Sequence, residues 1–446
     1  MSQYQPYAAY KDSGVEWLGR VPEHWPLRRL KHMARFSGGG TPTRDNPEFW
    51  NGDIPWVSPK DMKSEFITGA EECITAAGLS GSSSSMVPAK RVLMVVRSGI
   101  LKHTIPVAIN DVPVALNQDM KAIWLDSDYL SERFFMRWVQ GLNDDLLKVW
   151  LKQGATVESI EQDYLADTLM PVPPVSEREQ IAQLLDRETA RIDALIEKKT
   201  RFIELLREKR QALITHAVTR GLDPSAKMKD SGVEWLGEVP EHWGVKQLKH
   251  VVDPNSSITY GIVQAGPEYE GGVPYIRTSD MSGDELPVSG FPLTSPEIDE
   301  SYARSRVRPG DIVMSIRASV GKCLPVPDGL SVANLTQGTA KISPGSLITR
   351  DYLLAYLNSG AAQVYFDLMA KGATFREITL DALRRTPMLV PPAHEQADID
   401  QFIARHVARL DGLVQLSERS IVMLKERRSA LITAAVTGQI DLREAV

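Results

Sequence analysis

The stretch Lys11–His32, KDSGVEWLGRVPEHWPLRRLKH, returns almost unchanged at Lys229–His250 as KDSGVEWLGEVPEHWGVKQLKH. Of these 22 positions 17 are identical, and the two copies stand 218 residues apart throughout. A self-match of this length at one constant offset indicates an internal duplication. The chain therefore consists of two repeats, and each feature of one half predicts a counterpart in the other.

Shorter blocks return at the same offset and give the order of the parts. They are Gly154–Thr156 with Gly372–Thr374, Pro173–Pro174 with Pro391–Pro392, and Gln211–Thr219 with Ser429–Thr437. Between the blocks lie divergent stretches of short β-branched runs punctuated by Gly, Pro and Asn, which predict strands and turns. Helices are predicted at Asp128–Lys148 and Asp351–Met369, each weakened by one internal glycine, Gly141 and Gly360. The fold class is therefore mixed α/β.

The length of 446 residues corresponds to about two to four domains. We predict a first globular domain at residues 1–173 and a long helix at 174–220. A second globular domain follows at 221–391, and a second long helix with a C-terminal tail occupies 392–446.

Both long helices carry a heptad pattern of apolar residues. From Ser176 to Thr219 neither Pro nor Gly occurs, so nothing interrupts a helix there. The predicted seam residues are Ile181, Leu185, Ile192, Leu195, Phe202, Leu206 and Leu213 in the first helix, and Ile399, Ile403, Leu410, Leu413, Leu424 and Leu431 in the second. A helix of this length with one apolar stripe needs a partner, and the other copy is its equal in length. The alternative is that each helix only covers its own domain.

Composition excludes several classes of protein. The two cysteines, Cys73 and Cys323, cannot build a disulfide framework or a cysteine-rich zinc site, which indicates a reduced cytoplasm. No apolar run approaches the ~18 residues of a membrane span. The chain has no phosphate-binding loop, no HExxH and no CxxC, and Asp253–Asn255 only approaches the Asp-Pro-Pro-aromatic loop of an amino-methyltransferase. The net charge of −6 argues against a wholly basic coat for nucleic acid but permits a local basic groove.

The histidines and tryptophans of the repeated block have two interpretations. They are His24, His32, His242 and His250, with Trp17, Trp25, Trp235 and Trp243. Paired histidines can bind a metal and exposed tryptophans can stack on bases. Residues that recur in both halves beside Gly and Pro are more often parts of a structural turn and packing anchors. We favour the structural interpretation and predict no metal site and no catalytic residue.

Basic and polar residues of the divergent stretches are candidates for contacts with DNA. Arg304, Arg306 and Arg308 alternate, so in a strand they would project from one face toward phosphate or base edges; a solvated edge strand is the competing interpretation. Further candidates stand in equivalent places of the two halves: Arg97 and Lys102 with Arg317 and Lys322, and Gln118 with Gln337. A glutamine can contact adenine through two hydrogen bonds, or it can satisfy a buried turn.

The chain resembles one family, the specificity (S) subunits of type I restriction–modification systems. The resemblance rests on the repeated GVEWLGxVPEHW block, on SGGGTPTRDNPEFWNGDIPWVSPKDM at Ser37–Met62, and on ALNQDMKAI at Ala115–Ile123. It extends over nearly the whole chain. The second half departs from it, because SGGGTP has no clear counterpart in the sequence near Val251–Gly261.

The resemblance implies two target-recognition domains, each reading one half of a split site in double-stranded DNA. The two helices would form an antiparallel coiled coil that sets their spacing and docks two modification (M) subunits. In such a complex the M subunits bind S-adenosylmethionine and methylate adenine, and ATP-dependent restriction (R) subunits cut, so this chain would itself carry no cofactor. Two alternatives are a fused restriction–modification enzyme and a scaffold of two adaptor domains that bind no DNA.

Overall fold

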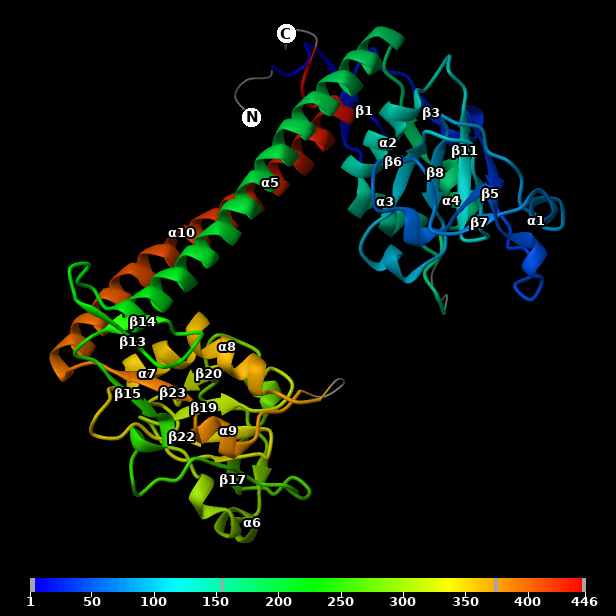
Figure 1. The fold of residues 1–446 in the computed structure, drawn as a ribbon. Helices are drawn as coiled ribbons and strands as arrows, with labels where there is room; N and C mark the ends of the chain where they lie inside the picture. Colours follow the sequence, from blue (N-terminus) through cyan, green and yellow to red (C-terminus); the bar gives the residue numbers. More distant parts are fainter. Residues whose placement is uncertain (1–4, 153, 155, 373–375, 443–446) are drawn as a thin grey trace. The chain divides into compact units, whose positions relative to one another are not determined.

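The computed structural model describes residues 5–152, 154, 156–372 and 376–442, and these fall into two compact units. Unit 1 comprises Met1–Lys199 and Arg419–Val446, and unit 2 comprises Thr200–Glu418. Two long helices, α5 (Val175–Arg220) and α10 (Ala393–Val436), contribute to both units (Figure 1). The predicted division gave each helix a segment of its own, whereas each compact unit includes a part of both. Ala155, Ala373 and Thr374 of the shared Gly-Ala-Thr blocks lie outside the described residues.

Unit 1 is built on a five-stranded sheet in the order β4-β11-β8-β9-β6. Its strands are β4 (Ala34–Gly38), β6 (Phe66–Ile67), β8 (Val92–Val95), β9 (Val107–Asn110) and β11 (Met120–Leu125). A second sheet, β10-β5-β7, joins β10 (Ala115–Leu116), β5 (Trp50–Val57) and β7 (Cys73–Ile74), with β10 parallel to β5. The two-stranded ribbons are β1 (Tyr10–Asp12) with β2 (Arg20–Pro22) and β3 (Leu27–Arg29) with β12 (Leu169–Pro171). The short helices are α1 (Ala76–Ser80), α2 (Glu132–Gly141), α3 (Asn143–Trp150) and α4 (Gln162–Asp167).

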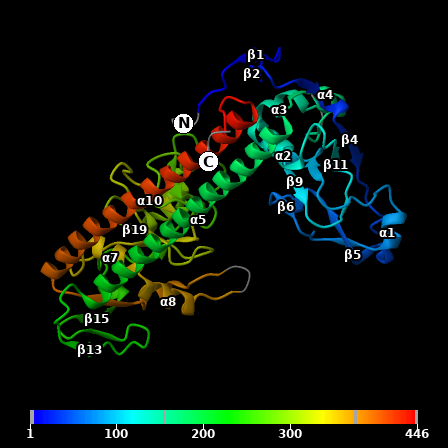
Figure 2. The ribbon, with the colours of Figure 1, turned by 90° about the horizontal axis from the view of Figure 1, so that it is seen from above.

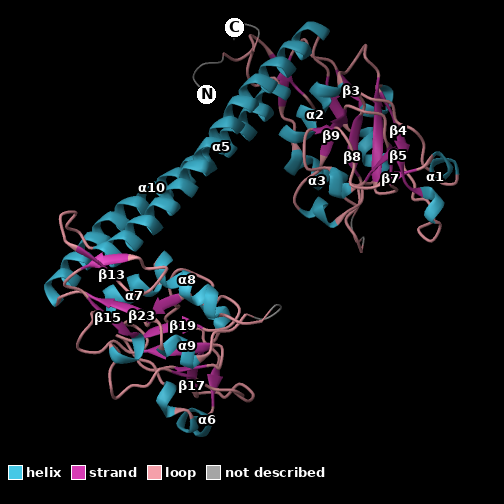
Figure 3. Cartoon of the chain, in the orientation of Figure 1, coloured by secondary structure: helices cyan, strands magenta, loops and turns pink. Residues whose placement is uncertain are grey.

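Unit 2 repeats this plan with shorter strands and a four-stranded main sheet; Figure 3 colours its strands magenta. Its main sheet runs β16 (Thr259–Tyr260), β22 (Thr339–Ile342), β19 (Ile312–Ser315), β20 (Cys323–Pro325), and the smaller one β18 (Leu293–Thr294), β17 (Val273–Ile276), β21 (Asn334–Leu335). The ribbons are β13 (Met228–Asp230) with β14 (Glu238–Pro240) and β15 (Gly244–Gln247) with β23 (Pro387–Val390). Its short helices are α6 (Pro296–Ser301), α7 (Arg350–Leu357), α8 (Gly360–Met369) and α9 (Leu380–Arg384). The mixed α/β class and the duplication are confirmed.

The two glycines inside the predicted domain helices mark contacts with the long helices. Each predicted helix is in fact a pair, α2 with α3 and α7 with α8. A Cβ atom at Gly141 would lie 3.0–3.1 Å from Ile432 and Thr433 of α10. In unit 2 the N–H of Gly360 donates to the hydroxyl of Thr215 of α5, at 2.8 Å. Thr215 and Thr433 occupy the same position of the repeated ALIT block, so the glycines let the long helices approach.

The long helices pair with each other in opposite directions. In unit 2, Arg207 contacts Glu418 at 3.4 Å and Arg210 contacts Asp411 at 3.3 Å, so the partner number falls as the α5 number rises. In unit 1, Arg428 of α10 contacts Asp193 of α5 at 3.0 Å. Figures 1 and 2 show the two ribbons side by side from two directions. The predicted antiparallel coiled coil is confirmed. The helix ends also cover the domains, since Ile181 and Leu185 belong to the core of unit 1.

The seam has two apolar positions in each heptad, and the prediction is right for the first of them and wrong for the second. Leu185, Ile192, Leu206 and Leu410 are buried, but the predicted seam residues Leu195, Phe202 and Leu413 are 36–45% exposed. Ile203 is buried in place of Phe202. The second seam position therefore comes four residues after the first rather than three. Both alternatives are apolar in this sequence, so residue type alone could not separate them.

No helix in the described part of the chain is long and apolar enough to cross a membrane.

Candidate nucleic-acid interface

Three separate segments of unit 1 meet at one end of its sheets. The N–H of Arg97, just after β8, donates to the carbonyl oxygen of Asp119 at 3.3 Å. The N–H of Gly40 donates to the carbonyl oxygen of Leu116 at 2.9 Å, and the hydroxyl of Thr41 donates to the side chain of Gln118. The structure therefore brings the candidates Arg97 and Gln118 to the same edge, beside the glycine-rich loop.

Gly39 permits this meeting because no side chain fits there. A Cβ atom at Gly39 would lie 2.2 Å from the carbonyl oxygens of Leu116 and Asn117. In unit 2 a Cβ atom at Gly261 would lie 1.9 Å from the carbonyl oxygen of Leu335. Gly261 is thus the counterpart of Gly39. The sequence showed no counterpart to SGGGTP because the offset here is 222 rather than 218 and only one glycine is kept.

Unit 2 assembles the equivalent edge. The N–H of Gln337 donates to the carbonyl oxygen of Ile262 at 3.0 Å, and the N–H of Ile316 donates to that of Gly338 at 2.9 Å. Arg317, which follows Ile316, therefore lies beside the Gln337 turn, as Arg97 lies beside the Gln118 turn. The equivalence of these four candidates in the sequence is reproduced in space.

Several candidate cations are already paired with acids or carbonyls. Lys102 contacts Glu158 at 3.4 Å and Arg317 contacts Glu377 at 3.0 Å. Lys322 donates to the carbonyl oxygen of Ser282 at 3.0 Å. Within the described residues the side chain of Arg97 is exposed and has no ion pair. Among the candidates in unit 1, Arg97 therefore has the positive charge that is most accessible to a phosphate or a base.

The strand predicted for Arg304, Arg306 and Arg308 does not form. Arg304 lies in a 3₁₀ turn (Ala303–Ser305) and the two other arginines lie in the irregular chain around β-bridge residue Val307. The guanidinium of Arg306 contacts Asp299 at 2.6 Å and also Glu300. Hydrogen bonds with these two carboxylates raise the pKa of Arg306 above its ordinary value. The three arginines therefore do not form a row, because the chain here continues the α6 turn and folds Arg306 back onto it.

Sequence reasoning missed Arg44, which belongs to the same loop as Thr41. Its guanidinium forms two hydrogen bonds with Glu72, one of 3.0 Å, and lies 4.0 Å from the ring centroid of Trp50. The hydrogen bond with Glu72 raises the pKa of Arg44. A guanidinium over the face of an aromatic ring is attracted to the ring, by roughly 0.5–1 kcal/mol at an exposed site. The sequence contains both residues in the stretch Thr43–Trp50. Only the fold shows that the guanidinium of Arg44 lies over the ring of Trp50.

The repeated block itself clamps the ends of the long helices. In unit 1 the carboxylate of Glu177, at the start of α5, accepts hydrogen bonds from Trp25 Nε1 and His24 Nε2, both 2.9 Å. The Trp25 ring also lies 3.1 Å from a Cβ atom placed on Gly438, where α10 has ended.

Unit 2 contains the same clamp with the helices exchanged. Glu395, at the start of α10, accepts from Trp243 Nε1 at 2.9 Å and His242 Nε2 at 2.6 Å. The Trp243 ring lies 3.2 Å from a Cβ atom placed on Gly221, at the end of α5. The structural interpretation of His24, His242, Trp25 and Trp243 fits this geometry. Among the described residues, no group of three His, Cys, Asp or Glu side chains could hold a metal ion.

Comparison with known families decides what the duplicated architecture is. The profile of the type I restriction modification DNA specificity domain matches residues 22–205 and again residues 240–424. The chain belongs to this family. The predicted membership of the specificity subunits is confirmed, and the two globular parts are its two target-recognition domains.

Curated specificity subunits align with different shares of the chain. The EcoR124I/EcoR124II specificity subunit of Escherichia coli is 34% identical over 44% of this chain, and the aligned stretch spans 46% of that relative. The EcoBI specificity subunit of Escherichia coli is 26% identical over 74% of this chain and 70% of its own. The MjaIX specificity subunit of Methanocaldococcus jannaschii is 22% identical over 96% of both chains.

Two solved structures share the fold. A chain from a study of complex assembly and conformational transition of the type I R-M system superposes with a TM-score of 0.68 at 17% identity, covering 94% of this chain and 99% of its own. The HsdS subunit from Thermoanaerobacter tengcongensis gives a TM-score of 0.52 at 17% identity, covering 94% and 98%.

Proposed function

We propose that this chain selects the DNA target of a type I restriction–modification complex and that each unit reads one half of a bipartite site. The observation that carries the proposal is that the same edge of the sheets forms in both units. It brings together Arg97 and Gln118 in unit 1, and Arg317 and Gln337 in unit 2. Arginine and glutamine can each form paired hydrogen bonds with a purine in the major groove. The surrounding loops differ, with Thr41 and Arg44 in one unit and Ile262 in the other, so the two half-sites would differ in sequence.

The proposal assigns the chemistry to partner subunits. Two M subunits would bind S-adenosylmethionine and methylate adenine, and R subunits would use ATP and cut, in the cytoplasm. This chain would bind DNA without catalysing a reaction. Its two pseudo-equivalent halves would offer two similar faces to two identical M subunits.

The helix pair supports a docking role, because one flank of it is apolar and exposed. Arg207 directly follows the buried seam residue Leu206, and Glu418 directly follows the buried seam residue Ser417. The ion pair between Arg207 and Glu418 places both of them on one flank of the helix pair. The residues that precede the seam, Leu205 and Leu416, therefore lie together on the opposite flank. Leu416 is 62% exposed, and the exposed residues Phe202 and Leu413 extend the same flank.

Such a cluster of large apolar side chains is unusual on a surface that faces only water. We assign this flank of unit 2, Phe202, Leu205, Leu413 and Leu416, to an M subunit. Double substitution of Leu205 and Leu416 by Lys should weaken the association with M and leave DNA half-site preference unchanged.

Selection from a pool of random DNA duplexes tests the reading of DNA. The full chain, with its M subunits, should enrich two short conserved sequences separated by a spacer of fixed length and random sequence. Enrichment of no sequence would contradict the proposal and favour the two-domain scaffold. Methyl transfer by the purified chain alone, with S-adenosylmethionine and the selected duplex, would instead favour the fused enzyme.

A further inference from the structure

The two helix clamps differ in one neighbour of the buried glutamate. In unit 1 the hydroxyl of Tyr7 is a third donor to Glu177, beside His24 and Trp25, at 3.2 Å. The Tyr7 ring is buried, with its centroid 5.4 Å from that of His24 and 5.7 Å from that of Trp25. Tyr7 thereby covers the clamp, and the Glu177 side chain is only 8% exposed.

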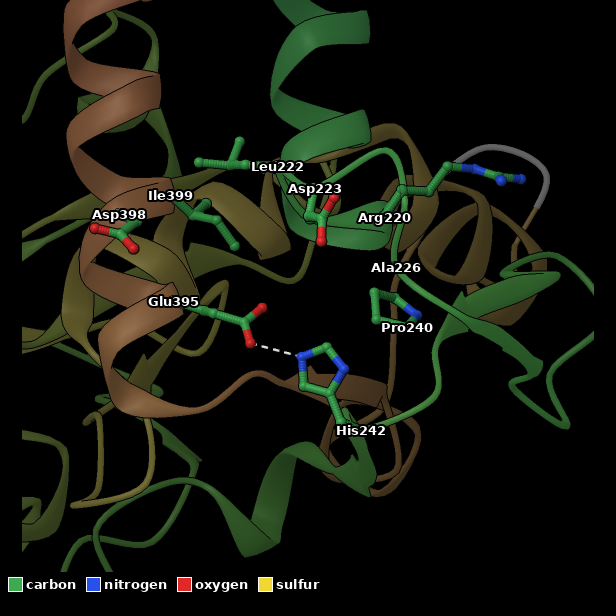
Figure 4. Close-up of a pocket in the computed structure, with 10 residues that line it drawn as sticks. Arg220, Leu222, Asp223, Ala226, Pro240, His242, Glu395, Asp398 and Ile399 are labelled. Carbon is green, nitrogen blue, oxygen red and sulfur yellow. Dashed lines mark hydrogen bonds and ion pairs between the residues drawn. The ribbon is translucent and has the colours of Figure 1, made fainter.

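Unit 2 has no tyrosine at the corresponding place. The residue 218 positions after Tyr7 is Ser225, which is exposed. Glu395 keeps its bonds to His242 and Trp243, but its side chain is 27% exposed. A pocket of about 220 Å³ opens beside it, as the close-up in Figure 4 shows. Arg220, Asp223, Ala226, His242, Glu395 and Ile399 are among the residues that line this pocket.

The pocket has the size and the lining that a phenol ring requires. An apolar cavity of about 150 Å³ is large enough to take benzene. Ala226, Pro240 and Ile399 supply apolar walls, and the carboxylate of Glu395 supplies an acceptor at the pocket surface. A tyrosine side chain combines an apolar ring with one hydroxyl donor. The acidic residues Asp223, Glu395 and Asp398 disfavour an anionic ligand such as a phosphate.

We propose that this pocket is a socket for a tyrosine side chain of a partner protein. Unit 1 fills the equivalent place with its own Tyr7, and that tyrosine belongs to a peptide segment held at the end of α10, where the hydroxyl of Tyr10 donates to the carbonyl oxygen of Gly438 at 3.0 Å. A clamp that takes a ring attached to a peptide backbone in one unit has the geometry to take another in its copy. Unit 2 is therefore the half of the chain that can recruit a partner through this site.

Binding of N-acetyl-tyrosinamide to the full chain tests the proposal by ligand-detected NMR. We expect one saturable site in the unmodified chain and none in Ala226→Trp, whose indole fills the pocket. Tyr7→Ala should vacate the unit 1 place and raise the number of sites to two. Tyr7→Phe is its matched control and should stay at one, since the ring remains. Glu395→Gln should weaken binding about tenfold, because a hydrogen bond to a charged acceptor is stronger than one to a neutral acceptor.

Three results would overturn the proposal. They are the absence of saturable binding to the unmodified chain, binding that neither Ala226→Trp nor Glu395→Gln reduces, and a Tyr7→Ala chain that still has one site. Binding of 4-methylphenol with exclusion of N-acetyl-tyrosinamide would show a site for free phenols and would also reject a protein-borne tyrosine. Should Ala226→Trp fail to fold by circular dichroism, Glu395→Gln decides alone.

Discussion

Arg306 illustrates how neighbouring carboxylates determine what an arginine can do. Asp299 is buried, and its carboxylate is shared between Arg306 and the side-chain amide of Asn334, 2.7 Å away. A guanidinium used in this way holds α6 against the chain that follows it. Its ion pairs with Asp299 and Glu300 therefore stabilise unit 2.

Arg306→Ala should accordingly lower the free energy of unfolding of unit 2. Loss of one partner leaves a buried acceptor incompletely satisfied, which costs about 1–3 kcal/mol. Urea unfolding measures this, and Arg304→Ala, an exposed neighbour, is the control expected within about 0.5 kcal/mol of the unmodified chain. An Arg306→Ala chain with unchanged stability and altered base preference would show that the ion pairs are dispensable and that Arg306 reads DNA.

The paired glutamines allow a test of the two half-sites separately. Gln118→Ala should relax the preference at one base pair of one half-site, with a loss of about 1–3 kcal/mol for the preferred base. Gln337→Ala should do the same in the other half-site only. Competition binding with single-base variants of the selected duplex measures both. Equal weakening at every sequence would instead indicate contacts with phosphate.

Part of the candidate site was predictable at this scale. Arg97 with Gln118 and Arg317 with Gln337 could be matched because side chains of the same type recur near one offset. Gly261 could not be matched to Gly39, since a glycine selected for close backbone approach leaves no side-chain pattern. The pairing of Arg306 with Asp299 needed the turn that replaces the expected strand.

Among the elements, α2 is fixed to both long helices by one ion network around the buried Arg137 in unit 1. Arg137 of α2 contacts Glu65 at 2.6 Å and Asp186 of α5 at 2.8 Å. Arg428 of α10 reaches Glu65 as well, at 3.0 Å. Burial raises the pKa of Glu65, but the two arginines outweigh it and hold this pKa below its ordinary value.

This network predicts an acid-sensitive contribution to stability. Because the pKa of Glu65 is lowered on folding, its contribution is complete above the unfolded value of about 4.3 and is lost as the pH falls through the lower folded value. Glu65→Gln should therefore be less stable than the unmodified chain at pH 7, and the difference should shrink below about pH 4. Thermal unfolding across this pH range measures it, with Glu71→Gln on the exposed surface as control. A difference independent of pH would contradict the role of the charge.

The elements were more predictable than their faces. Repeated apolar steps predict a long helix in each half, with no Pro or Gly in Ser176–Thr219 and a single glycine, Gly412, in the second stretch, and α5 and α10 are long helices. The phase of the seam was not predictable, because Leu195 stands beside Ile196 and Phe202 beside Ile203. Only the partner helix determines which of two adjacent apolar residues is covered.

For the molecule as a whole, the proposed function makes the spacing between the two DNA half-sites depend on the length of α5 and α10. Insertion of one heptad after Lys199 and one after Glu418 adds residues between the units and keeps the seam in register. Each helix grows by about 10 Å at 1.5 Å per residue, which corresponds to about three base pairs. Binding to the original spacer should fall clearly.

Duplexes with unchanged half-sites and spacers varied by single base pairs measure this effect. Recovery on a spacer about three pairs longer should be partial, since three pairs also rotate one half-site by roughly 100° around the duplex. An insertion in α5 alone is the control and should disrupt the coiled coil. A folded double-insertion chain that still prefers the original spacer would show that the helices do not set the distance.

Unit 1 draws on both ends of the chain. Ile432, Ala435, Val436 and Leu442 are part of its buried core, and Gln5 forms a β-bridge with Asp441. Domains of a growing polypeptide usually fold in the order of synthesis, at about 5–20 residues per second. Here Thr200–Glu418 form a continuous unit and can complete their fold first. The half that is synthesised earlier lacks the C-terminal part of α10, which completes its core, for on the order of ten to fifty seconds. The nascent first half is thus exposed to chaperones and proteases for as long as translation of the second half lasts.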